Sequence, residues 1–114
     1  MIEVCVELQF NVSYHSSGES PPPEACVTVA NGTNAHAILV EASNQHPCYN
    51  FTTKDTSYGH MIESICNIQG KVTPEQMFYW SIYIDDQTAQ VGIDDLKPGH
   101  RSKLDFEYTK FNLG

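Results

Sequence analysis

Long apolar runs and clusters of basic residues are both missing from this 114-residue chain. No stretch approaches the roughly 18 consecutive apolar residues of a membrane-spanning helix, so we expect no membrane span and a single domain over residues 1–114. Only 6 Lys and Arg residues stand against 14 Asp and Glu, which gives a formal net charge of −8. The basic residues are dispersed, which argues against a nucleic-acid partner because phosphate backbones are bound by clustered Lys and Arg.

Signatures of catalysis and of metal binding are missing as well. The sequence has no Gly-x-Ser-x-Gly motif and no Cys–His signature of a nucleophile, so we predict that it is not an enzyme. No CxxC pair or zinc-type Cys/His cluster occurs, and the histidines share no i, i+4 spacing. Asp85-Asp86 and Asp94-Asp95 lack the pattern of a calcium loop, and we interpret both pairs as surface turns. We therefore assign no metal ligand.

Four cysteines and three Asn-x-Ser/Thr sequons are present instead. The cysteines are Cys5, Cys26, Cys48 and Cys66, and the sequons begin at the glycosylation candidates Asn11, Asn31 and Asn50. This combination is typical of the oxidising secretory pathway, so we predict a secreted, extracellular glycoprotein stapled by two disulfide bonds. No signal peptide opens the chain, from which we expect a mature form. Of the three connectivities that four cysteines allow, we favour Cys48 with Cys66 and Cys5 with Cys26.

Alternating and helical patterns divide the chain into strands around one helix. Period-2 alternation predicts a first strand ending near Phe10, and residues 25–30 read as its hairpin partner. Between them, residues 16–24 form an exposed Pro-rich loop. The apolar stripe Ala35, Ile38, Leu39 and Ala42 predicts a helix that is capped by Thr33 or Asn34 and ends before Pro47.

The second half of the chain predicts further strands. Residues 49–53 and 61–68 flank a turn, 77–84 form an aromatic central strand, and 89–93 return beside it. Pro98 and Gly99 suit a type II turn before a last strand that carries Leu104, Phe106 and Tyr108 on one face. Strands before and after one helix indicate an α+β fold.

A series of short motifs runs through the chain in a fixed order. The motifs are Tyr58-Gly59-His60-Met61-Ile62 with Ser64-Ile65, Tyr79 to Asp85, Val91-Gly92-Ile93-Asp94-Asp95, Pro98-Gly99 and, upstream, Val29 to Ala35 with Ile38-Leu39. In order and spacing, this series resembles the C-terminal domain of transcobalamin and gastric intrinsic factor. The resemblance covers nearly the whole chain. It implies a β-grasp-like mixed sheet with one helix, as a free-standing member of the family.

The resemblance also implies a function. In these carriers the domain lies over one face of the corrinoid while a larger α/α barrel, without counterpart in these 114 residues, grips the other face. The implied ligand-binding residues are Tyr79, Trp80, Thr88, Ala89, Gln90 and Val91. Adjacent strand residues point to opposite faces, so at most one of Tyr79 and Trp80 fills the core, and the other is a candidate ligand platform.

Two functions follow as alternatives. The first is a secreted, non-catalytic binding domain for a corrinoid or another small hydrophobic ligand, with no certain cofactor and cobalamin as the implied ligand. The second is a secreted protein–protein interaction module, for signalling, adhesion or as an effector, without a small ligand.

Overall fold

The structure is a computed structural model that describes residues 1–10, 23–57 and 59–112. Most of the expected Pro-rich loop lies outside the described residues, and of its members Pro23 and Glu24 are exposed. The elements are β1 (Ile2–Phe10), β2 (Ala25–Val29), α1 (Ala35–Gln45), the 3₁₀ helix η1 (Pro47–Tyr49), β3 (Phe51–Thr56), β4 (Gly59–Ile65), β5 (Ile68–Gln69), β6 (Lys71–Val72), β7 (Gln76–Ile84), β8 (Gln87–Thr88) and β9 (Ser102–Asn112). Within the described ranges, no helix is long and apolar enough to cross a membrane.

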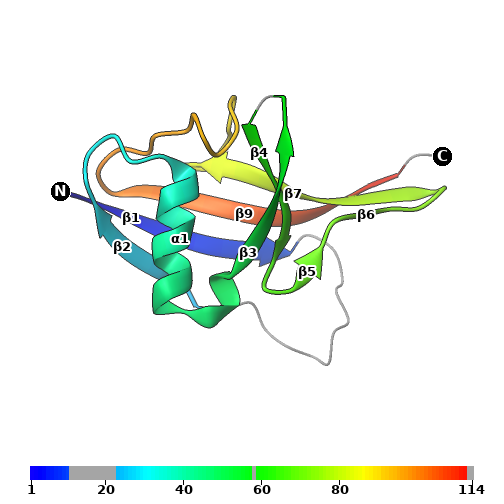
Figure 1. Ribbon diagram of the computed structural model, residues 1–114, viewed down its shortest axis with the longest axis horizontal. Helices are drawn as coiled ribbons and strands as arrows, with labels where there is room; N and C mark the ends of the chain where they lie inside the picture. Colours follow the sequence, from blue (N-terminus) through cyan, green and yellow to red (C-terminus); the bar gives the residue numbers. More distant parts are fainter. Residues whose placement is uncertain (11–22, 58, 113–114) are drawn as a thin grey trace.

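A six-stranded mixed sheet forms the body of the molecule (Figure 1). Its strand order is β2-β1-β9-β7-β6, with β8 also paired to β7, and β1 runs parallel to β9 while the other pairs are antiparallel. The aromatic strand β7 is an interior strand, as expected, and lies between β9 on one side and the short strands β6 and β8 on the other. One edge of β7 pairs with β9 from Gln76 to Ile84, whereas its other edge is paired only near its ends, by β6 and β8.

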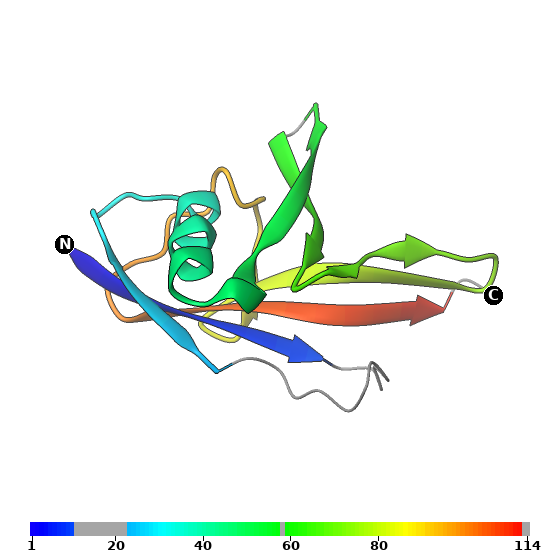
Figure 2. The same ribbon diagram turned by 60° about the horizontal axis from the view of Figure 1, so that its bottom comes forward.

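The helix and a smaller sheet cover one face of the main sheet (Figure 2). Asn34 caps α1 by accepting a hydrogen bond from the Ala37 amide at 2.9 Å, as one of the two predicted caps. The predicted stripe of Ala35, Ile38, Leu39 and Ala42 is buried and joins the core side chains of β1, β2 and β9. The smaller sheet, in the order β3-β4-β5, lies on the same side as α1. The α+β expectation is therefore confirmed as a mixed sheet with one α-helix.

Two expectations about turns are wrong. Residues 89–93 do not form a strand, because Asp85 and Asp86 both adopt positive φ in a tight turn, and the returning strand β8 ends already at Thr88. The turn before β9 lies later than Pro98-Gly99: the Ser102 amide donates to the Gly99 carbonyl at 3.2 Å, and Arg101, with a φ of 65°, holds the left-handed position. The Arg101 amide is fixed there by the Glu3 carbonyl at 2.7 Å.

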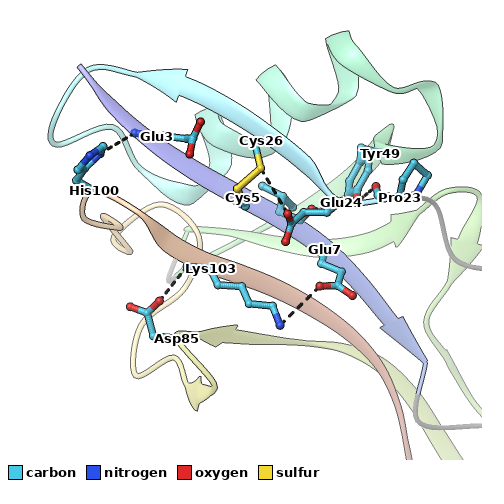
Figure 3. Close-up of a disulfide and its surroundings, with 11 residues drawn as sticks. Glu3, Cys5, Glu7, Pro23, Glu24, Cys26, Tyr49, Asp85, His100 and Lys103 are labelled. Carbon is cyan, nitrogen blue, oxygen red and sulfur yellow. Dashed lines mark hydrogen bonds and ion pairs between the residues drawn. A yellow bond between two sulfur atoms is a disulfide. The ribbon is translucent and has the colours of Figure 1, made fainter.

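Both disulfide bonds join the cysteines that the sequence favours. Cys5 and Cys26 face each other directly across β1 and β2, on the side of the main sheet that faces away from α1 (Figure 3). Cys48 in η1 is joined to Cys66, which directly follows β4. The second bond therefore fixes the open end of the β3–β4 hairpin, whereas the first reinforces two strands that are already paired.

Tyr49 links η1 to two other elements. Its side chain is fully buried, and its hydroxyl donates toward the Val6 carbonyl at 3.0 Å and the Pro23 carbonyl at 2.8 Å. Burial, reinforced by the nearby carboxylates of Glu7 and Glu24, raises the pKa of Tyr49 to about 12. The phenol therefore remains neutral far above the pH at which free tyrosine ionises.

Substituting Tyr49→Phe is expected to destabilise the protein at neutral pH by about 1–2 kcal/mol, because the buried Val6 carbonyl and the partly buried Pro23 carbonyl lose the hydroxyl that donates to them. The raised pKa makes this difference depend on pH. The folded state resists ionisation of Tyr49, so its stabilising effect is complete below about pH 10 and falls as the pH rises toward 12. Urea unfolding of both proteins at neutral and at alkaline pH measures this; a stability difference that stays constant across that range would contradict the assignment.

Candidate functional site

A groove opens between the smaller sheet and the outer part of the main sheet. Its volume is about 570 Å³, which lies in the range of small-molecule sites. The lining residues are Lys54, Met61, Ile62, Glu63, Gln69, Gly70, Lys71, Val72, Met77, Phe78, Tyr79 and Trp80. The β3–β4 hairpin and β5 supply one group of these residues, and β6 and β7 supply the other.

Two side-chain hydrogen bonds hold β5 against the main sheet. The Trp80 indole Nε1 donates to the Ile68 carbonyl at 2.9 Å, and the Tyr108 hydroxyl donates to the Gln69 carbonyl at 2.8 Å. Gly70 then passes close to β7, since an added Cβ would lie 2.9 Å from the Phe78 carbonyl oxygen. The short strand β6 thus starts directly beside β7 and bounds the groove.

Trp80 and Tyr79 lie on opposite faces of β7, as their adjacency requires. Trp80 is only 7% exposed and packs in the core against Phe10 and Tyr108, with ring centroids 5.9 and 5.1 Å away. Tyr79 is half-buried. Both residues line the groove. Trp80 is a packing residue that contributes to the groove wall, and Tyr79 is the more exposed of the two side chains.

The other four predicted ligand residues follow the turn at the C-terminal end of β7, and the first two of them lie beside that end of the strand. Thr88 is exposed and pairs with Tyr83, and Ala89 is half-buried, with its amide bonded to the Ile82 carbonyl at 2.9 Å. The Gln90 side chain donates to the Thr88 carbonyl at 3.2 Å, and Val91 is 46% exposed. None of these four lines the groove, so the structure separates the six predicted residues into two groups.

A cluster of ionisable side chains fixes the β3–β4 hairpin beside its turn, and no pattern in the sequence predicts this cluster. The Asp94 carboxylate accepts hydrogen bonds from the His60 amide at 2.6 Å and from its ring Nδ1 at 3.0 Å. The His60 ring also stacks on His36 of α1, with centroids 4.9 Å apart, and its Nε2 lies 3.3 Å from Asp55. The bond from the His60 amide, followed by the interactions with its ring, holds the pKa of Asp94 below its usual range.

The opposite face of the main sheet carries a buried carboxylate. Asp105 is only 3% exposed and lies in register between Glu7 on β1 and Tyr83 on β7. Burial raises its pKa, against the attraction of Lys103, whose ammonium lies 3.7 Å from Asp105 and 3.6 Å from Glu7. Figure 3 shows the Lys103 side chain extending toward Glu7. Asp105 lies on the face of β9 opposite Leu104 and Phe106, and neighbouring side chains on that face cover it.

The described residues contain one grouping with metal-ligand distances, namely Cys5, Glu24 and Cys26. Its two sulfur atoms are joined in a disulfide bond, so neither is available as a thiolate ligand. Two of the sequon asparagines, Asn31 and Asn50, are exposed, and Asn11 lies outside the described residues.

Comparison with known proteins places this small α+β domain in a family. The chain belongs to the family described as a domain of unknown function (DUF4430), whose model matches residues 38–110. It is also similar to cobalamin binding intrinsic factor from Canis lupus familiaris, with 27% identity over 85 residues, or 75% of this chain and 20% of the relative. The resemblance to the cobalamin carriers is thereby confirmed.

Solved structures share the fold. Haptocorrin in complex with Cbi matches 96% of this chain, with a TM-score of 0.79 at 19% identity, over 25% of the haptocorrin chain. A protein from Ruminococcus gnavus ATCC 29149, named as a candidate metal binding protein, matches 97% of this chain and 99% of its own, with a TM-score of 0.68 at 11% identity. The chain thus spans a fifth to a quarter of the carrier proteins, and nearly all of the bacterial one.

Proposed function

We propose that this chain is a non-catalytic binding domain of the cobalamin-carrier type, which covers one side of a corrinoid or a similar flat small ligand. The observation that carries the proposal is the sequence similarity to an intrinsic factor named for cobalamin binding. The ligand-sized groove beside Tyr79 and Trp80 supports it from the structure. We further propose that the domain is secreted, carries glycans at the sequons, and has a fold of the β-grasp type.

The proposed contacts form two groups along β7. Tyr79 and Trp80, which both line the groove, would meet the ligand there, while the largely exposed stretch from Thr88 to Val91 would meet it near the opposite end of the strand. An extended planar ligand is suited to contacts spread in this way. A compact ligand would need one of the two groups alone.

A domain that contacts one ligand face buries less of it than a two-domain clamp. Because association has a fixed entropic cost, we expect an affinity in the micromolar range, at Kd of about 1–100 μM. Titrating the protein with cobinamide, while following corrin absorbance and the emission of its single tryptophan, measures this. A Kd in that range supports the proposal, and no change up to about 1 mM would contradict it.

The Tyr79→Ala variant tests the placement of the ligand. Loss of an aromatic contact is expected to weaken cobinamide binding by about tenfold, while the fold persists because Tyr79 lies outside the main core. Val40→Ala is the matched control, since Val40 is an exposed apolar residue on α1 that lines no part of the groove. Equal affinities for both variants would show that Tyr79 does not contact the ligand.

A further inference from the structure

The charge of the groove differs in sign from that of the chain. Lys54 and Lys71 line it, one on β3 and the other on β6, and Glu63 is its single acidic lining residue. The lining therefore carries a net charge of about +1, from two lysines and one glutamate, on a chain whose total is −8. Two of the six Lys and Arg residues thus lie at one site.

Neither of these lysines forms an ion pair with another residue that the structure describes. No carboxylate of the described residues lies within 4.0 Å of the Lys54 or Lys71 ammonium, whereas Lys103 has two such partners. The Lys71 ammonium instead lies over the Phe78 ring, 5.0 Å from its centroid. In this position it remains available to an anion that approaches along the apolar surface.

Large apolar side chains remain exposed beside these two cations. Met61 on β4 is 55% exposed and Val72 on β6 is 71% exposed, and both line the groove together with Met77 and Phe78. Covering them with an apolar ligand would release their hydration shell, which favours binding. The groove thus combines an apolar surface with unpaired positive charge.

We propose that the groove binds a small amphipathic anion, with its apolar body on Met61 and Phe78 and its carboxylate paired with Lys54 and Lys71. The volume of about 570 Å³ accommodates a molecule of this class. A free molecule fits better than an anionic membrane or a second copy of the chain, because the charge of −8 repels a multiply charged surface far more strongly than a molecule that carries a single negative charge. This proposal rests on one part of the proposed function, namely that a small ligand enters this groove, and it adds the chemical class of that ligand.

Decanoate and decyltrimethylammonium, which share an alkyl chain and differ in the sign of their charge, test the proposal. Equilibrium dialysis with each probe, below its micelle concentration, gives the affinity, and the emission of Trp80 in the groove wall reports occupancy. We expect decanoate to bind at least about threefold more tightly than the cation. Decanoate binding without cobinamide binding would uphold this inference and contradict the corrinoid proposal. Cobinamide binding without decanoate binding would support the corrinoid proposal and contradict this inference.

Three charge substitutions make the test specific. Lys54→Gln and Lys71→Gln should each weaken decanoate binding by about two- to fivefold, and Glu63→Gln should strengthen it by about twofold. Lys97→Gln, an exposed lysine outside the groove, should leave the affinity unchanged. The proposal is overturned if decyltrimethylammonium binds as tightly as decanoate, or if the groove substitutions change the affinity no more than Lys97→Gln does. It is also overturned if sedimentation shows that the chain dimerises through this groove and that decanoate dissociates the dimer.

Discussion

Substituting Gly59→Ala is expected to lower the free energy of unfolding by about 2–4 kcal/mol and to free the tip of the β3–β4 hairpin. Gly59 has a φ of +110°, a conformation that is strained for any residue with a Cβ. An added Cβ would also lie 2.5 Å from the Asp94 carboxylate oxygen Oδ2. Since Asp94 would have to move, it would lose its hydrogen bonds to the His60 amide and ring.

Gly32→Ala is the matched control for this effect. Gly32 also has a positive φ, at 91°, but an added Cβ there would meet nothing within 4 Å. Its substitution should cost only the backbone strain, about 1–2 kcal/mol. Urea unfolding gives both values, and hydrogen exchange of the His60 amide reports the tip directly. If the two variants lost equal stability and kept equal protection at His60, the contact with Asp94 would have no energetic role.

Removing the Cys48–Cys66 bond, by serine at both positions, is expected to cost about 2–4 kcal/mol of stability and to weaken groove binding at least about tenfold. The bond closes the base of the hairpin that supplies Lys54, Met61, Ile62 and Glu63 to the groove. Without the Cys48–Cys66 bond, the β3–β4 hairpin that forms one wall of the groove is anchored mainly at its tip and through β5. Ligand binding must then order the wall, which lowers the affinity.

Serine at both Cys5 and Cys26 provides the comparison. The two bonds close chain segments of similar length, with sequence separations of 21 and 18 residues, so their removal should lower stability to a similar extent. Cys5 and Cys26 lie on paired strands away from the groove, and their loss should leave decanoate and cobinamide affinities within about twofold of the parent. Equal loss of binding in both double variants would mean that binding depends on global stability and not on the hairpin wall.

Local patterns in the sequence were sufficient to predict those elements whose structure depends on residues close by in the sequence. The helical stripe from Ala35 to Ala42, its cap at Asn34 and the alternation of β9 each depend on neighbours within one turn or one strand pair. The adjacency of Tyr79 and Trp80 likewise required opposite faces. Which ring turns inward depends on the register with β9, where Trp80 lies opposite Tyr108, and no local pattern encodes that register.

The groove and the cluster at the hairpin tip depend on contacts that are distant in sequence. His60 and Asp94 are 34 residues apart and meet only because the hairpin folds back over the loop that follows β8. The strands β5 and β6 are two residues long each, too short to give a periodic signal, yet they position the groove lining from Gln69 to Val72. Asp105 alternates with apolar residues as a solvated side chain would, and only the register of three strands shows that it is covered.

The proposal of a corrinoid-binding domain is tested most directly by mapping cobinamide onto the chain with amide chemical shifts. We expect saturating cobinamide to shift the amides around Tyr79, at the groove, and those from Thr88 to Val91. The amides of β2, which is the edge strand of the main sheet on the side away from β7, should remain unchanged. Shifts that are confined to β2 and the acidic face around Asp105, or no shifts at a cobinamide concentration of about 1 mM, would contradict it.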